Sequence, residues 1–135
     1  MSQTQIQAQN VKIEVVKILK RWNISESAII GEIKAYLFAN RRVSKDYVTL
    51  YSHDEWGSCR EWKHVVALPT GEYIPDGEWI DMSSNKNAHK YKVMALSEFI
   101  EKYANRELMI YVYESPSCNK SNQFSFKAVF KVVVE

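Results

Sequence analysis

The stretch VKIEVVKILKRW, residues 11–22, decides how the fold begins. Its apolar residues recur at the spacing of one buried helix face. Apolar residues form one side of such a helix (Val11, Val15, Ile18, Leu19 and Trp22), and charged residues form the other (Glu14, Lys17, Lys20 and Arg21). The pattern predicts an amphipathic helix over residues 10–22. The polar residues 1–9 before it predict a disordered tail.

A second helix is predicted directly after the first. Ser25 is suited to cap its first turn, and Glu26 complements the positive end of its dipole. The buried stripe of this helix is predicted to consist of Ile29, Ile33, Tyr36 and Leu37. After this helix the spacing of the apolar residues changes to alternation, with many β-branched and aromatic residues. This pattern predicts strands over 46–52 and 60–68.

Two turn signals follow the second of these strands, Pro69-Thr70-Gly71 and Pro75-Asp76-Gly77. Proline fixes the first position of such turns, and glycine accepts a positive φ. Together they predict a β-meander made of residues 60–68, 72–74 and 78–82. The polar residues 83–90 after it predict a loop.

A third helix is predicted to begin near Ser97, which would cap it, with Leu96, Phe99, Ile100 and Tyr103 pointing inward. Two strands then close the chain, over residues 107–115 and 123–135. The predicted order is ααβββαββ. This is a single α+β domain over residues 10–135, with an antiparallel sheet of about five strands and the helices packed on one side.

Composition places the chain among ordinary globular proteins, with 46% hydrophobic and 25% charged residues in 135. No apolar run approaches the roughly 18 residues that span a bilayer, so no contact with a membrane is expected. The N-terminal residues lack the pattern of a secretory signal. The two cysteines, Cys59 and Cys118, are therefore expected to be free thiols in a cytoplasmic protein.

Charge is unevenly distributed along the chain. Residues 10–45 hold eight basic and three acidic side chains, whereas residues 46–81 hold two basic and eight acidic ones. A basic and an acidic region in one small domain favour an oriented macromolecular partner or self-association. The alternative is that the two regions neutralise each other within the fold.

Three tryptophans fall within the acidic region. Trp56, Trp62 and Trp79, with the carboxylates Glu55 and Glu78 beside them, are typical of a protein contact surface that selects a basic partner. The first functional hypothesis is therefore a non-catalytic binding or adaptor protein. The alternative for each single tryptophan is a place in the core.

Nucleic-acid binding is the second hypothesis. It rests on basic residues in the N-terminal part of the chain: Lys17, Lys20, Arg21, Lys34, Arg41, Arg42 and Lys45. Interleaved with aromatic residues, they are suited to phosphate contact and base stacking. Residues 45–53, capped by Ser44, can also be interpreted as the recognition helix of a helix-turn-helix, although YVTLY favours a strand.

The window SHDEWGSCREWKH, residues 52–64, offers two further chemistries. His53, Cys59 and His64 are competent zinc ligands, but their spacing matches no usual zinc motif. Asp54, followed by Glu61 and Lys63, resembles the order of active-site residues in PD-(D/E)xK nucleases, where paired carboxylates hold Mg²⁺. Neither pattern is specific, so no catalytic residue, metal or cofactor is expected. The sequence leaves enzymatic activity undecided and favours a protein without it.

Overall fold

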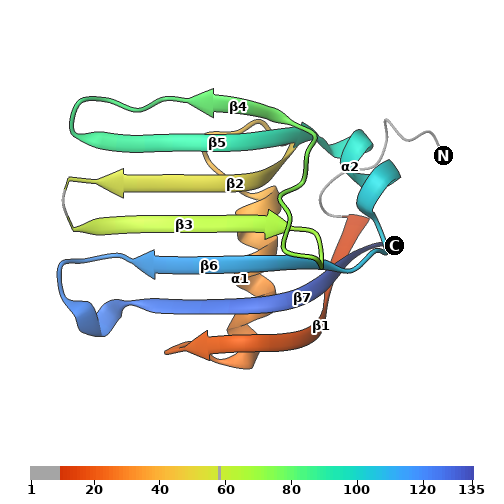
Figure 1. Ribbon diagram of the computed structural model, residues 1–135, viewed down its shortest axis with the longest axis horizontal. Coiled ribbons are helices and arrows are strands. Elements are labelled where there is room, and N and C mark those ends of the chain that lie inside the picture. Colours follow the sequence, from red (N-terminus) through yellow and green to blue (C-terminus); the bar gives the residue numbers. More distant parts are fainter. Residues whose placement is uncertain (1–9, 58) are drawn as a thin grey trace.

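The protein is mostly β. A computed structural model describes residues 10–57 and 59–135, which form a seven-stranded antiparallel sheet with two α-helices (Figure 1). The sheet order is β1-β7-β6-β3-β2-β5-β4. The elements are β1 (Val11–Trp22), α1 (Glu26–Phe38), β2 (Tyr47–Trp56), β3 (Arg60–Ala67), β4 (Glu78–Asp81), β5 (Asn87–Ala95), α2 (Leu96–Tyr103), β6 (Leu108–Ser115), the 3-10 turn η3 (Lys120–Asn122) and β7 (Phe124–Val134).

The helix predicted over residues 10–22 is wrong, because this segment is strand β1 and pairs with β7 along its length. Its start alternates as a strand does, with Val11 and Ile13 buried and the residues between them exposed. The register then shifts twice, between Val15 and Lys17 and between Ile18 and Lys20. Each bulge adds one residue to the period of two, and the resulting spacing imitates a helix. The fold is therefore not the predicted ααβββαββ domain.

The second predicted helix is confirmed as α1. The Ser25 hydroxyl accepts a hydrogen bond from the Ala28 amide, and Ile29, Ile33 and Leu37 are buried. Strand β2 begins at Tyr47, so the recognition-helix interpretation of residues 45–53 is wrong. Tyr47, Val48, Thr49 and Tyr51 pair with β5, and this pairing overrides any helical tendency.

The predicted meander does not form. Strand β4 pairs with β5 at the edge of the sheet, and β2 and β5 lie between it and β3. Residues 72–74 contribute only one isolated bridge, between Ala67 and Tyr73. The predicted loop over residues 83–90 contains the start of β5 at Asn87. Helix α2 begins after Ala95 without a side-chain cap, so Ser97 does not cap it.

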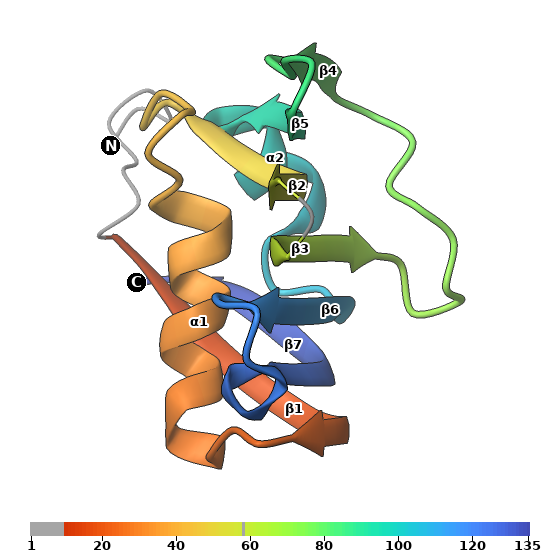
Figure 2. The ribbon, with the colours of Figure 1, turned by 90° about the vertical axis from the view of Figure 1, so that its left-hand side faces the viewer.

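The sheet has two different faces. Helix α1 covers one, which we call the helix face, and the segment from β3 to β4 passes over the other, the open face (Figure 2). One core cluster joins α1, α2 and the helix face, including Ile33, Phe99 and Phe130. Because directly paired residues of antiparallel strands point to the same side, the register assigns each strand residue to a face. Among the described residues, no helix is long and apolar enough to cross a membrane.

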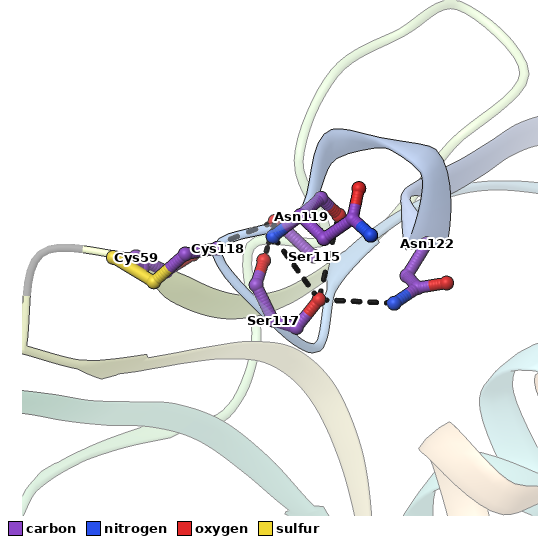
Figure 3. The surroundings of a disulfide bond; sticks show 6 residues. All are labelled: Cys59, Ser115, Ser117, Cys118, Asn119 and Asn122. Atoms are coloured by element: carbon purple, nitrogen blue, oxygen red, sulfur yellow. Dashed lines mark hydrogen bonds between the residues drawn. A yellow bond between two sulfur atoms is a disulfide. The ribbon is translucent and has the colours of Figure 1, made fainter.

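Cys59 and Cys118 form a disulfide, so the prediction of free thiols is wrong. The bond joins the turn after β2 to the loop after β6, where Ser117 accepts hydrogen bonds from Asn119 and Asn122 (Figure 3). Pairing of β3 with β6 brings the two loops to one end of the sheet, which a sequence separation of 59 residues cannot reveal. The expectation of a cytoplasmic location loses the support of free thiols, because structural disulfides persist mainly in oxidising compartments.

Candidate functional site

A hollow of about 700 Å³ opens on the helix face, beside the C-terminal half of α1. We call it the helix-side hollow. Its volume lies in the range of small-molecule binding sites, roughly 300–1,000 Å³. Its walls combine acidic and aromatic side chains with the arginines that follow α1; the acidic and aromatic ones are Glu32, Tyr36, Asp54, Trp56, Trp62, Tyr91 and Glu114.

Sheet register and helix period bring these residues together. His89, Asp54, Trp62 and Glu114 are successive partners across β5, β2, β3 and β6, so they form one row on the helix face. Glu32 and Tyr36 lie one turn apart on α1, so both face that row from the same flank of the helix. The site thus draws on five elements.

Asp54 is the centre of one hydrogen-bond network. Its Oδ1 accepts a hydrogen bond from His89 Nδ1 at 2.7 Å and another from the Tyr91 hydroxyl. Arg42 Nε lies 4.0 Å away, and its guanidinium stacks over Trp56, 5.4 Å from the ring centroid. Burial, then the hydrogen bond to Asp54, raises the pKa of Tyr91. Asp54 is therefore held by two donors from β5 and lies at the edge of ion-pair distance from Arg42.

Glu32 and Glu114 form a second, separate group. Tyr36 donates a hydrogen bond to Glu114 Oε2 at 2.5 Å, and Glu32 is hydrogen-bonded to the same carboxyl group. Burial, reinforced by the charge of Glu114, raises the pKa of Glu32 to about 7. Burial and Glu114 also raise the pKa of Tyr36, so its hydroxyl stays protonated. Glu32 therefore exchanges its proton near neutral pH, next to the Glu114 carboxyl group.

Behind Tyr36 lies the buried His64, and the centroids of the two rings are 4.9 Å apart. Its Nε2 is 2.8 Å from the Thr49 carbonyl oxygen, and its Nδ1 is 2.6 Å from the Ser52 hydroxyl. Burial lowers the pKa of His64 to about 4, so the ring is neutral. His64 supports the wall of the hollow and does not reach its interior.

The three tryptophans of the sequence hypothesis do not share a surface. Trp56 and Trp62 line the helix-side hollow, whereas Trp79 pairs with Lys92 on the open face. Of the two carboxylates, Glu55 pairs with Glu61 on the open face, and Glu78 is exposed on β4. The structure therefore keeps two tryptophans in one site and separates the third.

The predicted zinc ligands are not brought together. Cys59 is in the disulfide, His64 lies on the helix face, and His53 lies on the open face. Asp54 also lies on the opposite face from Glu61 and Lys63, so the nuclease arrangement does not form. A different group has metal-binding character on the open face: donor atoms of His53, Glu55 and Glu61 lie within 4.8 Å of one another, and His53 Nε2 is 2.9 Å from Glu61.

The basic residues of the nucleic-acid hypothesis are dispersed. Lys17 and Lys20 lie on β1 at one edge of the open face, and Arg21 is 3.8 Å from Glu26. The others are Lys34, exposed on α1, Arg41 and Arg42 at the hollow, and the exposed Lys45. They do not form one basic surface.

Sequence reasoning did not select His89, Tyr91 or Glu114 as site residues. His89 lies in the predicted loop, and the other two are single polar residues in apolar strands. Only the sheet register joins them to Asp54 and Trp62. No known protein family model matches the chain, and no curated protein or solved structure matches it either.

Proposed function

We propose that the protein is a binding protein whose helix-side hollow takes an organic cation: an ammonium or guanidinium group carried on an apolar body. The observation that carries the proposal is that Glu32, whose pKa burial and Glu114 raise to about 7, lies against the Glu114 carboxyl group beside Trp62. A lysine or arginine side chain of a partner protein supplies both the charge and the apolar body. This keeps the hypothesis of a basic protein partner and assigns it a different surface.

The carboxyl pair, and not the hollow as a whole, supports a cation, because Arg41 and Arg42 also line the hollow. Asp54 is engaged by His89 and Tyr91 and lies 4.0 Å from Arg42, so a ligand cation would compete there with the guanidinium. Glu114 accepts a hydrogen bond from neutral Tyr36, and among the described residues no basic side chain lies within ion-pair distance of Glu32 or Glu114. A bound cation would favour the ionised form of Glu32 and so replace its proton.

The aromatic walls support the same chemistry. Trp62 is the direct cross-strand partner of Glu114, and Tyr36 lies on α1 above that carboxyl group. A cation close to the carboxylates therefore has aromatic faces beside it, which add cation–π attraction in a partly desolvated site. Aliphatic carbons of the ligand can pack on the indoles of Trp56 and Trp62.

Isothermal titration calorimetry tests the proposal. The probes are N-acetyl-arginine amide and N-acetyl-lysine amide, with spermidine as a free amine and uncharged N-acetyl-norleucine amide as the control. We expect the cations to bind, and to bind about tenfold more tightly at pH 8 than at pH 6, because a group with a pKa near 7 loses its proton over that interval. Tighter binding of spermidine than of the amino-acid amides would point to a small-molecule amine instead of a protein side chain.

Two variants locate the site. Glu114→Gln should abolish binding of the cations and its pH dependence, whereas Glu101→Gln, an equal charge change on the exposed surface of α2, should change neither. Equal binding of norleucine amide, or full binding by Glu114→Gln, would show that the proposal is wrong.

A further inference from the structure

We propose that the open face of the sheet binds single-stranded nucleic acid, with phosphates on an array of lysines and a base in an aromatic recess at its β4 edge. This surface lies on the other side of the sheet from helix α1 (Figure 2), and the helix-side hollow lies beside that helix, so binding at the open face is independent of cation binding in the hollow.

Lysines and aromatic residues recur in rows that cross the open face from strand to strand. The paired register carries one row from β1 through all seven strands to β4; it includes Lys20, Lys127, Tyr111, Tyr51, Lys92 and Trp79. The adjacent row includes Trp22, Tyr113, Lys63 and Lys90. Several of these rings are well exposed: Trp79 by 56%, Trp22 by 49% and Tyr111 by 41%. Such an array presents stacking surfaces and cations at regular intervals.

The charge of this face is strongly positive. The strand residues assigned to it include eight lysines, from β1, β3, β5 and β7, and four carboxylates, whereas the whole chain has a net charge of only +2. Two of the carboxylates, Glu55 and Glu61, lie together at one end of the face beside His53. The other two, Glu14 and Asp81, are direct cross-strand partners of Lys131 and Lys90, and the excess of lysines makes the face as a whole complementary to a polyanion.

An aromatic recess of about 350 Å³ lies where the segment 68–77 passes over the open face. Tyr51, Tyr73 and Trp79 are in its wall, and the rings of Tyr51 and Trp79 meet edge to face at 5.2 Å. Lys92 Nζ donates a hydrogen bond to the Ile74 carbonyl oxygen and so holds this segment in place. Lys90 Nζ lies 4.9 Å from the centroid of Trp79, so a cation lies against one ring in the wall of the recess.

The shape of the face favours a single strand over its competitors. A broad sheet cannot enter the major groove of a duplex, which admits a helix or a two-stranded ribbon. A second copy of this chain would bring two positive faces together. A single strand can lay its phosphates along the lysines and turn its bases toward the rings.

Fluorescence anisotropy with labelled oligothymidylate and oligouridylate of twelve nucleotides tests the proposal in about 50 mM salt. We expect binding that weakens as salt rises. Lys63→Ala with Lys127→Ala should weaken it at least fivefold and reduce the slope of log affinity against log salt by about 1.4, since each phosphate contact contributes roughly 0.7. Lys34→Ala with Lys45→Ala removes the same charge from exposed sites off the face and should change affinity less than twofold.

The aromatic contribution is tested at constant charge. Trp79→Leu should weaken binding and leave the salt slope unchanged, and Tyr111→Leu on a central strand provides the same test away from the sheet edge. The circular dichroism of each variant verifies that it folds. The proposal is overturned by any of four results: no binding in 50 mM salt, equal losses in the control lysine variant, equal affinity for a duplex or for heparin, or full binding by both aromatic variants.

Discussion

The Ser52 hydroxyl donates a hydrogen bond to Nδ1 of His64 across the β2–β3 ladder, with 2.6 Å between the two atoms. The direction of this hydrogen bond follows from the partner of the other ring nitrogen, Nε2. Because the Thr49 carbonyl can only accept, the hydrogen atom must be on Nε2, which leaves Nδ1 as an acceptor. Ser52 and His64 are both fully buried, so this pair is structural, although serine beside histidine also occurs in catalytic sites.

Ser52→Ala should lower the free energy of unfolding by about 1–3 kcal/mol, because it leaves Nδ1 of His64 buried without a donor. Urea denaturation followed by tryptophan fluorescence measures this loss. Ser97→Ala on the exposed surface of α2 is the control and should cost little. A loss for Ser52→Ala no larger than that of the control would mean that the hydrogen bond contributes nothing to stability.

The pKa of His64 predicts how acid weakens the fold. Burial lowers this pKa from 6.5 to about 4, so the unfolded chain binds a proton at His64 between these values and the folded protein does not. The contribution of the neutral His64 ring to the free energy of unfolding is fully present above pH 6.5. As the pH falls toward 4, the free energy of unfolding decreases by about 3 kcal/mol. An NMR titration checks it directly: the ring signals of His64 should not shift between pH 8 and 5.5. A midpoint near 6.5 would contradict the assignment.

Glu32 has the opposite effect on stability. Its folded pKa is about 7 and its ordinary value is 4.5, so the folded protein binds the extra proton between these values. Stability from this group is present below pH 4.5 and is lost as the pH rises through 7. With allowance for solvent screening of a half-buried carboxyl group, the loss is about 1–2 kcal/mol.

Glu32→Gln should therefore stabilise the protein at pH 8 and leave it nearly unchanged at pH 4.5. Thermal denaturation at both pH values measures the difference, and Glu101→Gln provides the exposed control. Equal effects of Glu32→Gln at both pH values would show that Glu32 titrates as an ordinary surface carboxyl group.

The sequence predicted the parts of the fold whose signals are local. Helix α1 was found because Ile29, Ile33 and Leu37 keep an uninterrupted helical period after the cap at Ser25. Strand β1 was missed because two bulges disturb its alternation, between Val15 and Lys17 and between Ile18 and Lys20. A local pattern cannot distinguish a strand with two bulges from an amphipathic helix.

The candidate site was predicted only in part, because its members are joined by non-local register. Trp56, Trp62 and Asp54 were selected from one window of the sequence. Glu114 reaches Trp62 only through the pairing of β3 with β6, and α1 lies across the face that both residues share. The order of strands in the sheet, which places β3 between β2 and β6, has no signature in any one of those strands.

The disulfide between Cys59 and Cys118 should contribute about 2–4 kcal/mol to the free energy of unfolding, because it closes a loop of 59 residues in the unfolded chain. Urea denaturation with and without a phosphine reductant measures the contribution. Cys59→Ser with Cys118→Ser should reproduce the reduced protein and be insensitive to the reductant. Equal midpoints for oxidised and reduced wild-type protein would rule out a stabilising role.

Gly77 and Gly31 provide a matched pair of glycine substitutions with opposite expected effects. Gly77 has φ +115°, and a Cβ there would lie 2.8 Å from the backbone oxygen of Val93 on β5. Gly77→Ala should therefore cost at least about 1–2 kcal/mol and loosen β4 with its Trp79. Gly31 lies within α1, where a Cβ meets nothing within 4 Å, so Gly31→Ala should stabilise the protein by about 0.5–1 kcal/mol.

Urea denaturation of both glycine variants gives the two changes in free energy. Amide hydrogen exchange then shows whether the loss in Gly77→Ala is confined to β4 and β5, as we expect, because the clash involves the carbonyl oxygen of Val93. Equal protection of β4 in wild-type protein and in Gly77→Ala would mean that the turn adapts without strain. The edge strand would then not depend on the glycine.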